Sequence, residues 1–118
     1  MGQPVVHFEI GAKDHKKAME FYAKVFDWSY DEHGGMNYGM VSAQGKDSIG
    51  GGIASIQEGQ QPYVTFYVMV DDLQAYLDKA EANGGNTVVP PTPIPEIGSF
   101  AWLSDPDGNC IGIFKDGA

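Results

Sequence analysis

Two side chains near the start of the chain, His7 and Glu9, are the residues best suited to chemistry. They are two residues apart in the β-rich segment 4–10, PVVHFEI, so in a strand they share one face while apolar residues share the other. A neutral imidazole beside a carboxylate can act as acid and base near physiological pH, or as the remnant of a weak metal site. The other interpretation is a structural histidine bonded inside a polar cavity.

The elements that must position this pair recur once along the chain. The first half predicts a strand at 4–10, a helix from the Asp14 cap to about Phe26, a hairpin around Gly34-Gly35 and a strand at 49–56. The second half predicts a strand at 63–70, a helix from Asp72 to the Asn83-Gly84-Gly85 cap, and strands at 86–90, 99–104 and 110–114. Superposing Asp14 on Asp72 places His7 on Thr65, which indicates an internal repeat.

This repeat predicts one α+β domain, residues 1–118, built from two tandem βαβββ modules at about 4–57 and 62–116. We expect curved mixed sheets with the helices on the convex side, which leaves a concave face for a site.

Three segments give the chain a family likeness: VVHFEIGAKDHKKAMEFYAKVFDW, VMVDDLQAYLDKAEANGG and FAWLSDPDGNCIGIF. With them, the whole chain resembles the vicinal oxygen chelate superfamily, which comprises glyoxalases, bleomycin resistance proteins and dioxygenases such as dihydroxybiphenyl dioxygenase. More narrowly, it resembles short bacterial glyoxalase-like proteins of unknown function. The resemblance implies either a divalent-metal enzyme or a drug-binding protein without chemistry.

The resemblance also implies four metal-ligand positions, of which this sequence keeps one. The first falls on His7, the second within the glycine run Gly50–Gly52, the third on Thr65 and the fourth on Gly112. A metal site needs at least three protein ligands and an open position. We therefore expect no cofactor and no metal ligand. The alternative is a divalent-metal lyase, isomerase or dioxygenase that uses His7 and Glu9.

Aromatic residues and a few other side chains share the inferred concave strand faces, and they suit an apolar or aromatic small molecule. The predicted ligand-binding residues are Tyr38, Met40, Tyr63, Thr65, Tyr67, Phe100, Trp102 and Phe114. The competing interpretation is that they only fill the space between the half-sheets or form a dimer interface. The glycines at 50–52 and 112 indicate either room in the pocket or a β-bulge.

The remaining expectations concern one loop, the single cysteine and two further histidines. The Pro-rich loop 90–98 is either a stiff lid with Glu96 at its tip or a connector, which we favour. We expect Cys110 to be a small buried residue, and His15 and His33 to be exposed.

The composition excludes several partners. The net charge of the 118 residues is −9 and arginine is absent, so nucleic acid and anionic membranes are poor partners. The single cysteine and the lack of a signal-peptide pattern at the N-terminus suit the cytoplasm. The acidic balance and aromatic faces favour a cationic planar ligand. An open sheet edge predicts a homodimer.

Overall fold

The chain forms two compact units in the computed structural model, which describes residues 2–33 and 38–117. The N-terminal unit comprises residues 7–65, and the C-terminal unit comprises residues 1–6 and 66–118. The expected turn at Gly34-Gly35 lies outside the described residues.

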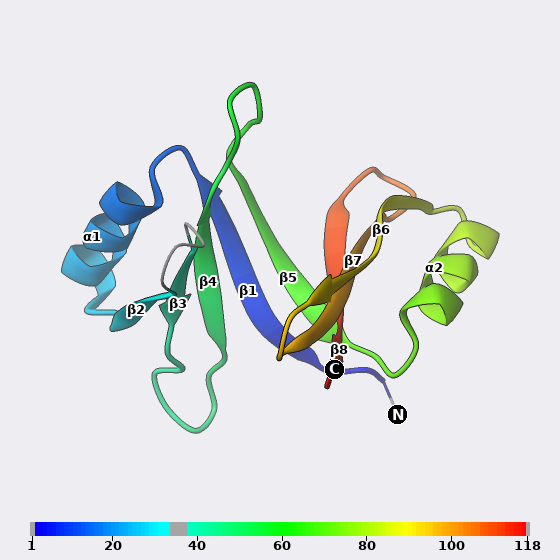
Figure 1. Cartoon of the computed structure of the whole chain (residues 1–118), viewed down its shortest axis with the longest axis horizontal. Helices are drawn as coiled ribbons and strands as arrows, with labels where there is room; N and C mark the ends of the chain where they lie inside the picture. Colours follow the sequence, from blue (N-terminus) through cyan, green and yellow to red (C-terminus); the bar gives the residue numbers. More distant parts are fainter. Residues whose placement is uncertain (1, 34–37, 118) are drawn as a thin grey trace. The chain divides into compact units, whose positions relative to one another are not determined.

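The order of elements is the predicted one, βαβββ twice, so the α+β architecture is confirmed (Figure 1). The elements are β1 (Val5–Ala12), α1 (His15–Phe26), β2 (Tyr30–His33), β3 (Tyr38–Val41), β4 (Gly50–Ser55), β5 (Tyr63–Met69), α2 (Leu73–Ala82), β6 (Asn86–Ile94), β7 (Gly98–Ser104) and β8 (Cys110–Asp116). The strand orders are β2-β3-β4-β1 in the first module and β6-β7-β8-β5 in the second. Each module has one parallel pair, β1 with β4 and β5 with β8, and is otherwise antiparallel. The internal repeat predicted from the sequence is thus present in the structure as two copies of the same strand and helix arrangement.

Both helices begin at the predicted caps. The Asp14 carboxylate accepts hydrogen bonds from the backbone N–H groups of Lys16 (3.0 Å) and Lys17 (3.3 Å), and Asp72 accepts one from Ala75 (3.1 Å). These bonds satisfy N–H groups that have no partner within the helix. The helices have 12 and 10 residues, and no helix in the described part of the chain is long and apolar enough to cross a bilayer.

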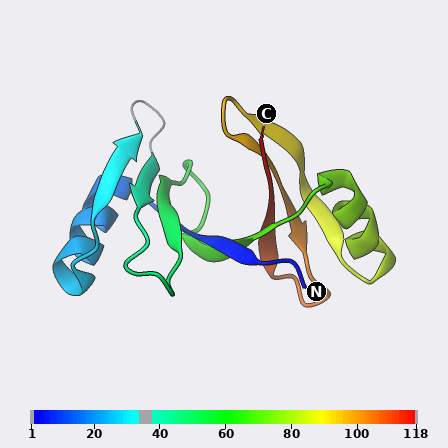
Figure 2. The ribbon, with the colours of Figure 1, turned by 90° about the horizontal axis from the view of Figure 1, so that it is seen from below.

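Each helix packs on one face of the strands of its own unit (Figure 2). Met19 of α1 is buried against Val41 and Ile53, with Phe8 and Ile10 of β1 packed beside them. In the C-terminal unit the buried residues are Val70, Leu73, Leu77, Ala101 and Ile113. The apolar face of β1 therefore meets the helix, which leaves His7 and Glu9 on the opposite face.

The Pro-rich segment differs from the prediction. We expected a loop over 90–98, but residues 90–94 continue β6, and Thr92 lies opposite Phe100 of β7. Two register irregularities, between Thr87 and Val89 and between Val89 and Thr92, accommodate the prolines. Prolines are tolerated here because β6 ends the strand order, where one edge needs no N–H donor. Only residues 95–97 form a turn, with Glu96 at a φ of 69°.

Glycines in the strands lie under aromatic rings. A Cβ added at Gly52 would overlap the Tyr38 ring, and one at Gly112 would overlap the Tyr67 ring. The β1–β4 register is continuous from Gly50 to Ser55, so the glycine run is not a bulge. The space that these glycines leave is filled by the protein's own tyrosines, and the expectation that it is open room is wrong at these two positions.

Replacing Gly112 with alanine should destabilise the protein. The added methyl group would displace the Tyr67 ring, and such overpacking lowers the free energy of unfolding by about 1–3 kcal/mol. Urea unfolding measures the change. Gly45→Ala is the control, because nothing lies within 4 Å of its added Cβ, and its stability should be equal or slightly higher. Equal stability of the Gly112→Ala protein would contradict this role of the glycine.

Candidate functional site

A buried carboxylate, Glu9, is the centre of the polar cluster in the N-terminal unit. Its side chain is only 7% exposed. The Tyr38 hydroxyl donates to Glu9 Oε1 (3.0 Å) and the Tyr63 hydroxyl donates to Glu9 Oε2 (2.7 Å). Burying a carboxylate is costly unless its oxygens are hydrogen-bonded, so the two phenols make this position of Glu9 tolerable.

Tyr38 also connects Glu9 to His7. The distance from His7 Nε2 to the Tyr38 hydroxyl oxygen is 2.8 Å. The single hydroxyl hydrogen of Tyr38 is directed at Glu9, so the hydrogen of this second bond comes from His7 Nε2. Neutral His7 is therefore protonated on Nε2. The predicted His7–Glu9 pair exists as a chain in which Tyr38 is the middle member.

Three elements bring these four side chains together. His7 and Glu9 alternate with the helix-facing residues of β1, Tyr38 starts β3, and Tyr63 starts β5. The rings of Tyr38 and Tyr63 lie close to the backbone because a glycine, Gly52 or Gly11, is beneath each of them. The Tyr38 ring can then cross β4 above Gly52, so that its hydroxyl reaches the carboxylate on β1.

Burial lowers the pKa of His7 below its ordinary value of 6.5, and the negative charge of Glu9 opposes that shift. Desolvation is the larger effect, so His7 is neutral at pH 7. A neutral imidazole donates through Nε2 and offers a lone pair at Nδ1. This is the form suited to an acid–base role or to binding a polar group.

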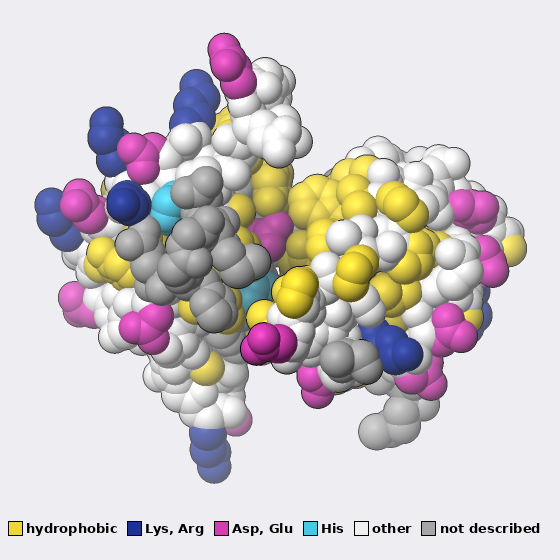
Figure 3. Space-filling model, in the orientation of Figure 1, with side chains coloured by type: hydrophobic (Ala, Val, Ile, Leu, Met, Phe, Trp, Pro, Cys, Tyr) yellow, Lys and Arg dark blue, Asp and Glu magenta, His cyan; other side chains and the backbone are white. Residues whose placement is uncertain are grey.

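The other residues predicted to bind a ligand lie in both units. In the N-terminal unit, Met40 is on the same face of β3 as Tyr38 and is 38% exposed, whereas Thr65 is buried. In the C-terminal unit, the Trp102 indole donates to the Tyr67 hydroxyl (2.8 Å), and Phe100 lies opposite Phe114 in the β7–β8 register. Hydrophobic side chains gather over the strands of this unit (Figure 3).

Two predictions about single residues are wrong. His15 is buried. Its Nδ1 lies 2.7 Å from the Ser55 hydroxyl, and its backbone N–H donates to the same oxygen (3.1 Å). Cys110 is exposed rather than buried. The side chain of His33 lies outside the described residues.

A divalent metal does not fit the described residues. In the part of the chain whose side chains are described, no group of three or more His, Cys, Asp or Glu residues could hold a metal ion. The backbones of Gly52 and Gly112, at the second and fourth positions implied by the resemblance, lie under tyrosine rings. Both oxygens of Glu9 already accept phenolic hydrogens. Two candidate ligands, His7 and Glu9, are fewer than the three that a metal site requires.

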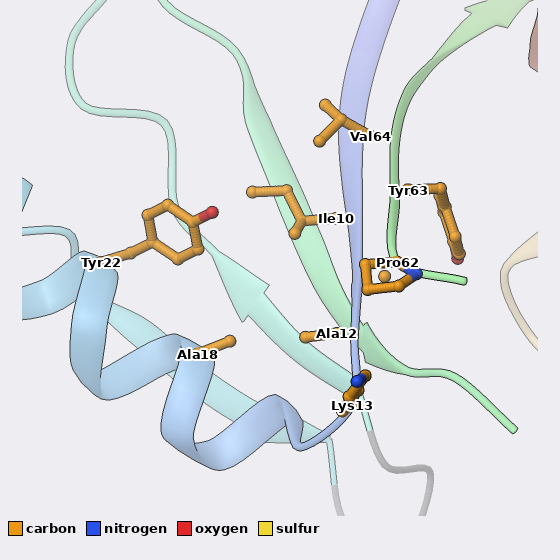
Figure 4. Close-up of a pocket in the computed structure, with 9 residues that line it drawn as sticks. Ile10, Ala12, Lys13, Ala18, Tyr22, Pro62, Tyr63 and Val64 are labelled. Carbon is orange, nitrogen blue, oxygen red and sulfur yellow. The ribbon is translucent and has the colours of Figure 1, made fainter. Parts of the chain in front are cut away.

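A hollow that the sequence did not indicate lies in the N-terminal unit. It is a pocket of about 440 Å³ between α1, β1 and the start of β5 (Figure 4). Its lining residues are Ile10, Gly11, Ala12, Lys13, Ala18, Tyr22, Pro62, Tyr63 and Val64. Helical spacing places Ala18 and Tyr22 on one face of α1, but it cannot show that small residues at 12 and 18 leave an opening.

The model of the glyoxalase/bleomycin resistance protein/dioxygenase superfamily matches residues 5–113. The chain belongs to this superfamily. Its relatives include "Putative glyoxylase CFP32" of Mycobacterium bovis, which is 29% identical over 113 residues, 91% of this chain and 43% of that protein. The anthracycline biosynthesis protein DnrV of Streptomyces peucetius is 24% identical over 93% of this chain and 46% of that protein. The chain thus spans under half the length of these relatives.

Solved structures of the superfamily share the fold. The Mn(II)-bound glyoxalase from Novosphingobium aromaticivorans matches with a TM-score of 0.70 and 20% identity, over 98% of this chain and 40% of that one. A superfamily member from Vibrio splendidus matches with a TM-score of 0.65 and 17% identity, over 98% of this chain and 100% of that one. At these identities the likeness concerns the fold alone.

Replacing Glu9 with glutamine should lower the pKa of His7 further. The substitution removes the negative charge that raises this pKa and leaves the desolvation that lowers it. NMR titration of the His7 imidazole resonances measures the shift. A His7 pKa that stays the same or rises in the variant would contradict the electrostatic coupling.

Proposed function

We propose that this protein binds a small aromatic or apolar molecule without a divalent metal, and that the His7–Tyr38–Glu9–Tyr63 network supplies the polar contacts. The observation that carries the proposal is that each oxygen of Glu9 accepts a hydrogen bond from a phenolic hydroxyl, which holds the carboxylate among aromatic rings. A carboxylate held in this way orients two tyrosines and an imidazole, and together with His7 it supplies only two of the three ligands that a metal site requires. The superfamily's name includes bleomycin resistance proteins, the group for which the sequence resemblance implies drug binding without chemistry.

The expected ligand is planar and carries a positive charge. Tyr38, Tyr63 and His7 give one strand face three rings around a buried carboxylate, and Met40 on that face is partly exposed. Aromatic rings attract cations through their π-faces, and the carboxylate adds charge complementarity. The net charge of −9 attracts cations at long range.

A metal-dependent lyase, isomerase or dioxygenase is the second candidate. It is favoured by the position of His7 and Glu9 on one strand face in a superfamily that includes a Mn(II)-bound glyoxalase. It requires at least one ligand beyond the described residues.

Metal loading and calorimetry separate these candidates. Protein stripped with chelator should bind planar aromatic cations from a panel as well as untreated protein does. Tyr38→Phe should weaken binding about tenfold or more, because one hydrogen bond to a charged group is worth roughly 1.5–3 kcal/mol. Tyr30→Phe is the matched control, since Tyr30 lies on β2 with its side chain exposed. Stoichiometric Mn²⁺ or Zn²⁺ that is lost in His7→Ala would favour the metal enzyme instead.

We also propose that the protein acts as a homodimer. Phe21, Val25 and Phe26 of α1 are 57%, 53% and 56% exposed, which is unusual for large apolar side chains on one helix. Covering them with a second copy would remove this surface from water.

Light scattering after size exclusion tests the dimer. We expect about twice the monomer mass of 12.7 kDa, and a shift toward the monomer in Phe21→Glu. Lys24→Gln, at an exposed position on the same helix, controls for the change of net charge by one unit. A wild-type monomer over the micromolar range would refute the dimer.

A further inference from the structure

The pocket between α1, β1 and the start of β5 has no role in the function proposed above, and it lies on the other face of the strands. Ile10 and Ala12 point from β1 toward it, whereas Glu9, the residue before Ile10, belongs to the opposite face. In Figure 4, Val64 points toward the hollow and the Tyr63 ring points away from it. The pocket is therefore distinct from the Glu9 network, although both use β1.

The lining of the pocket is apolar with a polar rim. Ala12 of β1 and Ala18 of α1 face each other across it, and their small side chains leave the opening (Figure 4). Val64 is 76% exposed, which is far more than expected for a branched apolar side chain on a strand. Covering Val64 and its neighbours with an apolar group would be favourable by about 25 cal/mol for each Å² removed from water.

Lysine is the charged residue at this pocket. Lys13 lines it, and the Tyr22 hydroxyl points toward Ile10 in the same hollow (Figure 4). The segment 13–24 carries four lysines and only two acidic residues, in a chain whose net charge is −9. Lys side chains accordingly gather around α1 on the face shown in Figure 3. This part of the surface attracts an anion, in contrast to the acidic remainder.

We propose that this pocket binds a monocarboxylate with an apolar body, such as a medium-chain alkyl carboxylate. The apolar body lies against Ile10, Ala12, Ala18 and Val64, and the carboxylate pairs with the Lys13 ammonium group. A volume of about 440 Å³ falls within the range of ligand pockets, roughly 300–1,000 Å³. Such a ligand contacts both the apolar lining and the Lys13 ammonium group. A cation would not pair with Lys13, and a polar anion would not use the apolar lining.

NMR titration with octanoate tests where and how the ligand binds. Amide shifts should be largest at the pocket residues Ile10, Ala12, Ala18 and Val64, and small at Met40 on the opposite face. Octanoate should bind about tenfold more tightly than hexanoate, because each buried methylene contributes roughly 0.8 kcal/mol. Octylammonium, which has the same chain and the opposite charge, should bind more weakly than octanoate.

Substitutions at exposed residues test the charged part and the apolar part of the site without disturbing the core. Lys13→Gln should weaken octanoate binding about threefold, as expected for an exposed ion pair, while Lys24→Gln at the far end of α1 leaves it unchanged. Val64→Asn should weaken it as well, with Val88→Asn, exposed in the C-terminal unit, as its control.

Three results would overturn the proposal. Equal binding of octylammonium and octanoate would exclude a role for Lys13. Shifts centred on Met40 would place the ligand on the Glu9 face, and they would leave the function proposed above intact. A change from dimer to monomer in Val64→Asn would show that a second copy of the chain occupies the pocket. Conversely, failure of the aromatic cations to bind would count against the Glu9 site and not against this pocket.

Discussion

The site depends on one requirement, which is that the Glu9 carboxylate, once buried, must receive hydrogen bonds. Two phenols meet it, and each phenol reaches the carboxylate only because a glycine lies under its ring. The Tyr38 hydroxyl in turn fixes which nitrogen of His7 carries the proton. Glycine placement, tyrosine orientation and histidine protonation are thus consequences of a single buried charge.

Much of the fold could be predicted because its signals are local. Asp14 and Asp72 are side chains that cap the helices next to them, and the alternation of Val6, Phe8 and Ile10 with His7 and Glu9 needs only the two-residue period of a strand. The extension of β6 through Pro91 and Pro93 was missed because proline predicts a loop. It is compatible with a strand only at a sheet edge, and edge position is a property of the whole sheet.

The site was only partly predictable. His7, Glu9, Tyr38 and Tyr63 could each be selected by type and strand face, but their connection through Tyr38 depends on the register of β1, β3 and β4. The burial of His15 was missed because its partner, Ser55, is forty residues away. The pocket beside Lys13 was missed because it results from the small size of alanines on two elements, and small residues carry no chemical signal.

The two tryptophans divide evenly between the units, one in each. Trp28 stacks on Tyr22 with ring centroids 5.3 Å apart, and Trp102 donates its indole hydrogen to Tyr67. Each unit therefore contains its own fluorophore, in a different environment. Indole emission can report whether the duplicated halves lose structure together or in sequence, which is a question about the cooperativity of a protein built from a repeated module.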